Sequence, residues 1–218
     1  VQAGEAFRVT ADHCILACFN AAIPYICPQL PEAQKEALRY GVKVPLVMTN
    51  VLLDNGRAFE KLGAVQIQCP DDPYVLVTLP PPTTTGGYQP VSPSESPMVV
   101  YMLSAPTVTP EAGETARDML LRARHEVYAT DFDTYERQVR EQLQALLGPH
   151  GFHHESDIKA ITVNRWAHGY SYAYLALDDP KWPQGQAPHE IGRQKFGRIS
   201  IANSASEARA YLDAAFDA

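Results

Sequence analysis

Hydrophobic and polar residues along the chain follow two periods, one typical of strands and one typical of helices. Phe7, Val9 and Ala11 alternate with polar neighbours, and a denser apolar run follows at residues 14–18. This pattern predicts a half-exposed strand, a turn and a buried strand. Further strands are predicted at 42–53, 64–69, 73–79 and 97–103, and a last one leads into the aromatic-rich segment after residue 157.

Three segments have the helical period. The first, at 30–41, has Pro31 at its start and Gly41 at its end, as helices often do. The second covers 115–128. The third starts near residue 130, stops at Gly148 and should bury one apolar face, which carries Phe132, Tyr135, Val139, Leu143 and Leu146. The stretch 80–97 is rich in Pro, Gly, Ser and Thr, which predicts an irregular surface loop.

These elements predict an α+β fold. A mixed sheet of about five or six strands, between residues 42 and 103, should be backed by the helices at 115–128 and 132–147. The 218 residues are 45% hydrophobic and 20% charged, which is typical of a globular protein with a substantial core. The formal net charge of −7 argues against a nucleic-acid partner, which would require a basic face. No apolar run approaches the length of a membrane span.

The cysteines and histidines show no metal-binding pattern. Cys14, Cys18, Cys27 and Cys69 lack the paired spacing of zinc ligands, so we expect buried thiols. The histidines of the polar stretch 150–154 have no cysteine or carboxylate support, and no metal site is expected. The chain also lacks a G-x-S-x-G elbow, a P-loop and a G-x-G-x-x-G dinucleotide motif.

An aromatic cluster stands in the stretch "NRWAHGYSYAY". Five ring-bearing residues fall within nine positions: Trp166, His168, Tyr170, Tyr172 and Tyr174. One interpretation is a structural core. The other is a ligand cage, because ring faces attract cations and stack on planar cofactors. Gly169 would let the backbone approach such a ligand closely.

Two other features are open to both structural and chemical interpretations. Lys43 lies between Val42 and Val44 in a predicted strand, so it faces either water or a cleft in which its ammonium could hold an oxygen. The chain ends in a strand at 199–202, a small polar turn and a helix start. Free backbone N–H groups there could hold a phosphate or a carbonyl, or Ser204 and Glu207 could form a plain capping box.

Three stretches resemble a known family when they are taken together and in order. They are "ADHCILACFNAAIPYICPQLPEAQKEALRYGVKVPLV", "ITVNRWAHGYSYAY" and "FGRISIANSASEARAYLDAAFDA". They are similar to the C-terminal part of the FAD-dependent amine oxidase superfamily, and within it to bacterial spermidine dehydrogenases. The resemblance implies a C-terminal fragment of a flavoenzyme, with FAD as cofactor and a small-molecule amine as substrate. A dinucleotide-binding portion of the same protein, N-terminal to this chain, would be its partner.

The resemblance implies catalytic and substrate-binding roles for four residues. Lys43 is similar to a family lysine that holds a water against flavin N5. Trp166 and Tyr170 resemble an aromatic pair that lies beside the flavin and the substrate amine. Their spacing is shorter than in many relatives, so Tyr172 is an alternative for the place of Tyr170 and a further substrate-binding candidate.

Cofactor-binding roles are implied for the end of the chain. Asn203 and Ser204 resemble turn residues near the ribityl and phosphate side of the flavin. Tyr211 and Leu212 resemble a helix start whose backbone N–H faces the flavin C2 carbonyl. The sequence departs from its relatives at Ala205, where they carry an acidic residue.

The resemblance also implies a division of the chain and a reaction. Residues 1–27 would be a remnant of the FAD-binding domain, 28–160 the substrate-binding domain, and 161–218 the return to the FAD-binding domain. Segments 14–18 and 199–202 should then lie side by side. The reaction would be hydride transfer from an amine C–N bond, of a polyamine such as spermidine, to FAD. A non-catalytic binding domain, or a flavin oxidoreductase with a non-amine substrate, remains an alternative.

Overall fold

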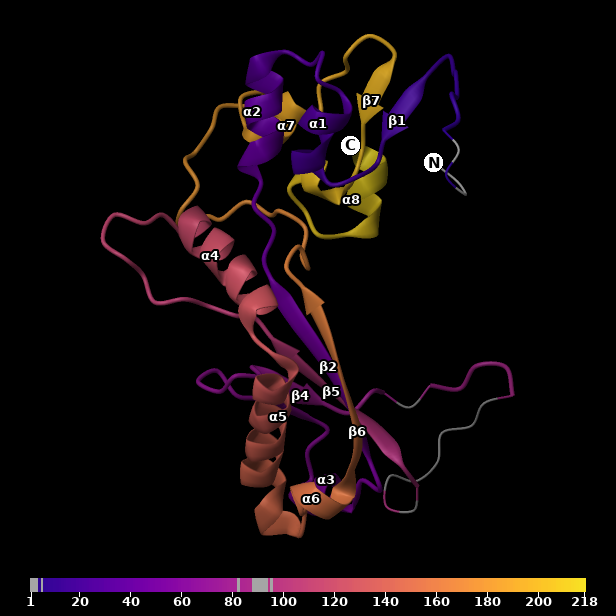
Figure 1. The fold of residues 1–218 in the computed structure, drawn as a ribbon, viewed down its shortest axis with the longest axis vertical. Helices are drawn as coiled ribbons and strands as arrows, with labels where there is room; N and C mark the ends of the chain where they lie inside the picture. The colour runs from indigo at the N-terminus through magenta and orange to yellow at the C-terminus, as the bar shows by residue number, and fades with distance from the viewer. Residues whose placement is uncertain (1–3, 5, 82, 88–93, 95) are drawn as a thin grey trace. The chain divides into compact units, whose positions relative to one another are not determined.

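The computed structural model describes residues 4, 6–81, 83–87, 94 and 96–218. Their contacts divide the chain into two compact units (Figure 1). We call Val44–Gly169 the sheet unit, and Val1–Lys43 together with Tyr170–Ala218 the terminal unit. The predicted loop at 80–97 lies partly outside the described residues, and its described part contains neither helix nor strand.

The sheet unit contains a five-stranded sheet with the strand order β3-β4-β5-β2-β6, in which every pairing is antiparallel. Its strands are β2 (Leu46–Leu53), β3 (Gln66–Gln68), β4 (Leu76–Thr78), β5 (Met98–Ser104) and β6 (Ile158–Trp166). The predicted α+β class is confirmed. The prediction of a mixed sheet is wrong, because every strand pairing in it is antiparallel. The predicted range of 42–103 is also wrong, because β6 joins the sheet as an edge strand beside β2. An alternating pattern records the face that each side chain takes, not the direction of the partner strand.

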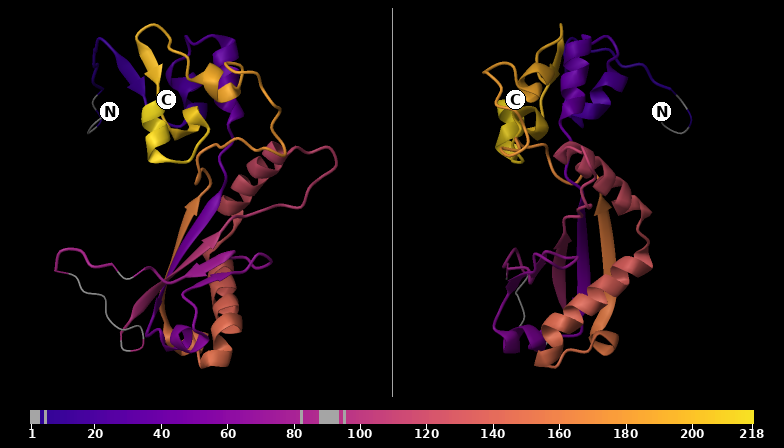
Figure 2. Two further views of the ribbon diagram at one scale, coloured as in Figure 1. Left: turned by 180° about the vertical axis from the view of Figure 1, so that it is seen from behind. Right: turned by 90° about the vertical axis from the view of Figure 1, so that its left-hand side faces the viewer.

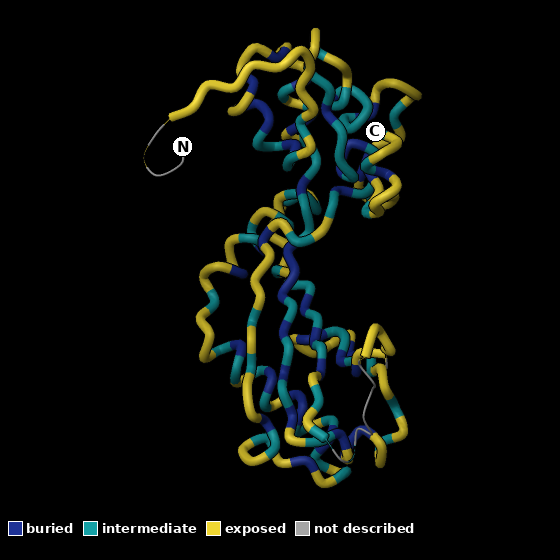
Figure 3. The backbone as a smooth tube through the Cα atoms, turned by 90° about the vertical axis from the view of Figure 1, so that its right-hand side faces the viewer, coloured by how far each residue is buried: buried dark blue, intermediate teal, exposed yellow. Residues whose placement is uncertain are grey.

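Burial along the strands follows their places in the sheet (Figure 3). The inner strand β2 is buried at alternate positions, namely Val47, Thr49, Val51 and Leu53. The edge strand β6 is exposed at most of its positions. The alternation in β2 therefore marks the face of the sheet that packs on the core.

Helix α5 (Phe132–Leu147) lies along one face of the sheet (Figure 2). Its buried residues Val139, Leu143 and Leu147 pack in one core with side chains of the strands, including Met102 of β5. The predicted apolar face of this helix is therefore correct at its centre. It is wrong at Phe132, which is 48% exposed, because the core contacts of the helix begin one turn later.

A buried glutamine joins α5 to the segment that leads into β4. The Gln142 side chain accepts a hydrogen bond from the backbone N–H of Tyr74 at 3.0 Å and donates one to the backbone carbonyl of Tyr74 at 2.7 Å. The Tyr74 hydroxyl lies 2.9 Å from Thr49 Oγ1. Burial raises the pKa of Tyr74 to about 12. All three side chains are buried, so these bonds satisfy polar groups that water cannot reach.

The other helices of the sheet unit are α3 (Arg57–Leu62), α4 (Ala116–Ala129), α6 (His154–Asp157) and the 3-10 turn η2 (Gly148–His150). Helix α4 starts where predicted, because Thr115 and Asp118 form a capping box that satisfies backbone N–H groups at its end. In the described part of the chain, every helix is too short or too polar to serve as a transmembrane span.

The terminal unit combines both ends of the chain. Strands β1 (Cys14–Leu16) and β7 (Ile199–Ile201) pair in parallel, and Cys14 faces Ile199. The expected juxtaposition of segments 14–18 and 199–202 is therefore confirmed. The helical elements of this unit are η1 (Asn20–Ala22), α1 (Ile23–Ile26), α2 (Glu32–Tyr40), α7 (Pro188–Gly192), η3 (Ser204–Glu207) and α8 (Leu212–Asp217).

A small core holds the terminal unit together. It is made of Ile23, Cys27, Leu30, Leu38 and Ile201. Three predictions about this unit are wrong. Residues 7–11 form no strand, β1 is exposed where a buried strand was expected, and Cys14 is an exposed thiol. Cys27 and Cys69 are buried as expected. The exposure of β1 follows from its position in a sheet that has two strands among the described residues.

Candidate functional site

The prediction that Lys43 lies in a strand is wrong: Lys43 follows α2 and precedes β2. Strand β2 starts only at Leu46, directly after Pro45, which has no N–H to contribute to a ladder. The Lys43 side chain is partly buried, and its Nζ lies 5.2 Å from the centre of the Phe19 ring. Burial lowers the pKa of Lys43 below its ordinary value, because a less hydrated ammonium is penalised. Lys43 is therefore not an ordinary solvated lysine.

Trp166 ends β6 in the sheet unit and is 54% exposed. The tight turn after it explains Gly169. A Cβ at Gly169 would lie 2.9 Å from the Leu46 Cβ and from the Trp166 carbonyl oxygen, closer than side-chain atoms approach. The Gly169 N–H also donates to the Val44 carbonyl at 3.1 Å. The glycine thus permits close packing within the chain, which is a different reason from the predicted approach to a ligand.

His168 lies in the same turn. Its Nε2 is 2.7 Å from a guanidinium nitrogen of Arg124 on α4. Burial lowers the pKa of Arg124, but the guanidinium remains a cation at neutral pH. The contact gives the His168 ring a cationic partner within the protein.

Tyr170 and Tyr172 belong to the terminal unit and differ in burial. Tyr170 is 47% exposed, whereas Tyr172 is buried. The Tyr172 hydroxyl donates to Asp179 Oδ2 at 2.8 Å. Its ring packs with Ala205 and Ala208 of the C-terminal turn. The core interpretation therefore holds for Tyr172, whose ring and hydroxyl already have protein partners, and fails for Tyr170.

Hydrogen bonds connect the C-terminal turn to both chain segments that make up the terminal unit. The Asn203 side chain accepts from the backbone N–H of Ser206, so Asn203 and not Ser204 caps η3. Its amide donates to the Cys18 carbonyl at 3.0 Å and to Asn20 Oδ1 at 2.7 Å. Ser204 Oγ lies 3.0 Å from Ser171 Oγ. These bonds fix the turn against the segment that leads from β1 into η1 and against the segment that carries Tyr170.

The sequence pattern predicts one helix at the end of the chain, but the structure has two separate helical elements there, η3 and α8. Ala208 adopts a left-handed conformation with φ of 50°, which separates η3 from α8. Such a conformation costs an alanine about 1 kcal/mol, so the surrounding contacts must hold it. They include an ion pair between Arg193 and Glu207. Helix α8 then starts at Leu212 with Tyr211 as its N-cap residue, and both side chains are exposed.

The structure thus gathers several of the candidate residues in one unit. Ser204 lies next to the segment that carries Tyr170 and Tyr172, whereas Trp166 belongs to the sheet unit. Sequence reasoning missed Tyr40, Asn20 and Asp179, whose side chains anchor these segments. An Asp directly before Pro180 in a tyrosine-rich stretch resembles a turn residue, so nothing in the sequence marked Asp179 as buried.

Comparisons with known proteins show which fold this is. No family model and no curated protein matches the sequence. Among solved structures, cyclohexylamine oxidase from Brevibacterium oxydans IH-35A matches 93% of this chain, with 13% identity and a TM-score of 0.59. Wild-type putrescine oxidase bound to putrescine matches 94% of the chain, with 13% identity and a TM-score of 0.55. The chain spans 40% of the length of each. It therefore has the fold of the matching part of these amine oxidase structures.

Proposed function

We propose that this chain is part of a flavoenzyme that oxidises the C–N bond of an amine, with FAD as its cofactor. The observation that carries this proposal is the fold match to cyclohexylamine oxidase and putrescine oxidase over nearly the whole chain. Fold alone does not determine function, so the residues at the candidate positions have to fit as well. A polyamine such as spermidine is the substrate that the sequence resemblance favours.

The residues of the terminal unit suit the cofactor in two places. The first backbone N–H groups of α8, after Tyr211 and Leu212, have no partners within the helix and can donate to a carbonyl. The ammonium of Lys43 is partly buried and can hold a water molecule close to the reacting nitrogen of the flavin. We assign Asn203 and Ser204 to the turn beside the ribityl and phosphate groups. FAD, when bound, supplies the hydride acceptor.

The exposed rings of Trp166 and Tyr170 would bind and orient the amine. Their faces attract the cationic ends of a polyamine by roughly 0.5–2 kcal/mol each, without a proton-transfer residue at the reacting nitrogen. His168 is held by Arg124, so we assign it no role as a general base. Tyr172 is buried, so we place it behind the site as a support for Tyr170 and not in contact with substrate.

The proposal includes a further dinucleotide-binding portion of the same protein. Parallel strands normally occur in sheets that are covered on both faces, yet Ile15 of β1 is 69% exposed. Two strands of three residues are too few for an independently stable sheet. We therefore expect further strands to extend this sheet. In this view residues 1–27 and 161–218 belong to the FAD-binding domain, and residues 28–160 belong to the substrate-binding domain.

The cofactor gives a direct test of the function. The purified protein that contains this chain should be yellow, with flavin absorbance at about 450 nm that an amine bleaches under anaerobic conditions. The 218-residue chain alone should bind FAD weakly, because most contacts to a dinucleotide come from the G-x-G-x-x-G unit that it lacks. A colourless protein would favour a non-catalytic binding domain. A yellow protein that no amine bleaches would favour another substrate on the same scaffold.

Replacing Lys43 by methionine should slow flavin reduction or reoxidation by roughly tenfold while FAD stays bound, because a water held at the reacting atom is lost. The variant should unfold at the same or a higher temperature. The penalty for burying the Lys43 charge is fully present below its lowered pKa and is relieved only as the pH rises toward 10.5. Stopped-flow absorbance and thermal melts measure the two effects.

The matched control for this experiment is Lys195→Met, because Lys195 is an exposed lysine of the same unit. It should change neither rate. If Lys43→Met leaves both half-reactions as fast as in the parent, Lys43 has no part in the chemistry.

A further inference from the structure

A buried carboxylate connects two segments of the terminal unit that are far apart in the sequence. Asp179 is 7% exposed. Its Oδ1 accepts a hydrogen bond from the Tyr40 hydroxyl at 2.7 Å. Its Oδ2 accepts from the Tyr172 hydroxyl at 2.8 Å and from the backbone N–H of Leu175 at 2.9 Å. One side chain therefore joins the end of α2 to the segment that begins at residue 170.

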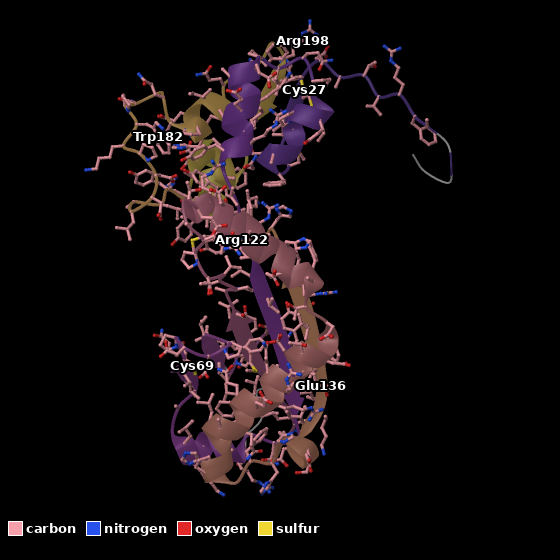
Figure 4. The ribbon with its side chains drawn as sticks, turned by 60° about the vertical axis from the view of Figure 1, so that its left-hand side comes forward. Cys27, Cys69, Arg122, Glu136, Trp182 and Arg198 are labelled. Carbon is pink, nitrogen blue, oxygen red and sulfur yellow. The ribbon has the colours of Figure 1, made fainter. Side chains whose placement is uncertain are left out.

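The rings around Asp179 give this connection a fixed geometry. Tyr40 meets Tyr172 edge-to-face, with ring centres 6.3 Å apart, and meets Trp182 in the same way at 5.5 Å. Trp182, labelled in Figure 4, also contacts Tyr174 at 6.0 Å. Such edge-to-face pairs are the preferred arrangement of aromatic rings. The Tyr40 ring thus contacts two other rings, and one of them is the second phenol that binds Asp179.

Direct packing connects the same two segments. A Cβ at Gly41 would lie 3.0 Å from Cγ of the Tyr172 ring, so a larger residue at that position would push the ring away. The ring thus lies against the backbone of the residue that follows α2. Two independent contacts, one polar and one steric, therefore join the end of α2 to Tyr172.

A carboxylate is expensive to bury unless its oxygens accept hydrogen bonds. Three donors on two separate segments meet this requirement, and bonds to a charged acceptor are stronger than neutral ones. The positions of the donors matter more than their number. Tyr40 lies three residues before Lys43, and Tyr172 lies two residues after Tyr170. Asp179 thus holds the backbone on which both candidate site residues stand.

We propose that Asp179 is a positioning residue that sets the placement of Lys43 and Tyr170 through the phenols of Tyr40 and Tyr172. The assignment rests on the proposed function in naming Lys43 and Tyr170 as site residues. Asp179 itself touches neither substrate nor cofactor in this role. Its removal should disturb the rate of the chemical step, for which both Lys43 and Tyr170 must be in place, more than the affinity for the amine, because the Trp166 ring still attracts the amine.

The test compares Asp179→Asn with Asp178→Asn. Asparagine keeps the size of the side chain but replaces one acceptor oxygen with an NH2 donor, so either Tyr40 or Tyr172 loses its acceptor. Asp178 is the neighbouring carboxylate and is exposed, which makes it a matched control. Asp179→Asn should slow flavin reduction at saturating amine by roughly tenfold, with the apparent dissociation constant of the amine changed less than about threefold. Asp178→Asn should match the parent in both quantities.

Hydrogen–deuterium exchange of the whole protein gives a second readout that does not depend on turnover. Asp179→Asn should speed exchange in the peptides that cover residues 38–44 and 170–176 together, and Asp178→Asn in neither. If Asp179→Asn does not fold, Tyr40→Phe and Tyr172→Phe take its place, because each removes one bond to Asp179 and keeps the ring. Two results for these variants would overturn the positioning role. One is exchange as slow as in the parent, and the other is an unchanged rate of flavin reduction together with a lower melting temperature. A parent protein without flavin or amine activity would refute the proposed function, and the exchange result alone would then decide whether Asp179 couples the two segments.

Discussion

Replacing Trp166 with alanine should lower amine turnover per bound flavin by roughly tenfold or more, because each lost transition-state contact of about 1.4 kcal/mol costs a factor of ten. The melting temperature should barely change. A buried tryptophan would cost about 3–5 kcal/mol of stability on truncation, but Trp166 is 54% exposed and cannot contribute that much. Tyr170, which is 47% exposed, should behave in the same way. Turnover per bound flavin and thermal melts on both variants provide the measurement.

Two exposed aromatic residues serve as controls for this experiment. Phe132 is 48% exposed and Tyr128 is 61% exposed, and both lie on helices of the sheet unit. Alanine at either position removes a comparable exposed ring to which the proposal assigns no role, so turnover should stay at the parent level. If Trp166→Ala and Tyr170→Ala also keep parent turnover, the aromatic pair does not bind the amine.

Replacing Gln142 with alanine should destabilise the sheet unit by about 2–5 kcal/mol, since each buried polar group left without a partner costs about 1–3 kcal/mol. The change removes both partners of the Tyr74 backbone, the acceptor at 3.0 Å from its N–H and the donor at 2.7 Å from its carbonyl. Because Tyr74 is fully buried, water cannot replace them without opening the core. Urea unfolding followed by circular dichroism measures the loss.

The control for this second experiment is Gln138→Ala, one turn earlier on α5, where the side chain is only partly buried. Its effect should stay within about 0.5 kcal/mol, as for most surface changes. An equal loss in both variants would show that helix propensity and not the buried bonds accounts for the effect of Gln142→Ala.

Elements with a strong local signal could be predicted from the sequence. The helix at Glu32–Tyr40 has a proline before it and a glycine after it, and α4 has the Thr115 and Asp118 capping box. These signals act within a few residues, so they do not depend on the rest of the fold. The pairing of β1 with β7 joins residues nearly two hundred positions apart, and it was predicted only through the family resemblance.

Other features depended on contacts that no local pattern encodes. Lys43 was placed in a strand because its neighbours are apolar, but Pro45 delays the start of β2. The helical pattern after the last strand gave no sign of the left-handed conformation of Ala208. That conformation depends on surrounding contacts such as the ion pair of Arg193 with Glu207. Gln142 stands on the apolar face of α5, and its two bonds to Tyr74 exist only once the chain has folded.

The sequence by itself determined the α+β class and most of the helices and strands, because period, capping and turn chemistry are local properties. The roles of the candidate site residues came from the family resemblance. Only the tertiary structure decided which of those residues are available for a ligand. It left Trp166 and Tyr170 exposed and buried Tyr172 against Gly41 and Asp179. The reason is physical: the burial of an aromatic residue depends on which distant segments pack against it. The local sequence therefore does not distinguish the buried from the exposed members of a group of four tyrosine and tryptophan residues within nine positions.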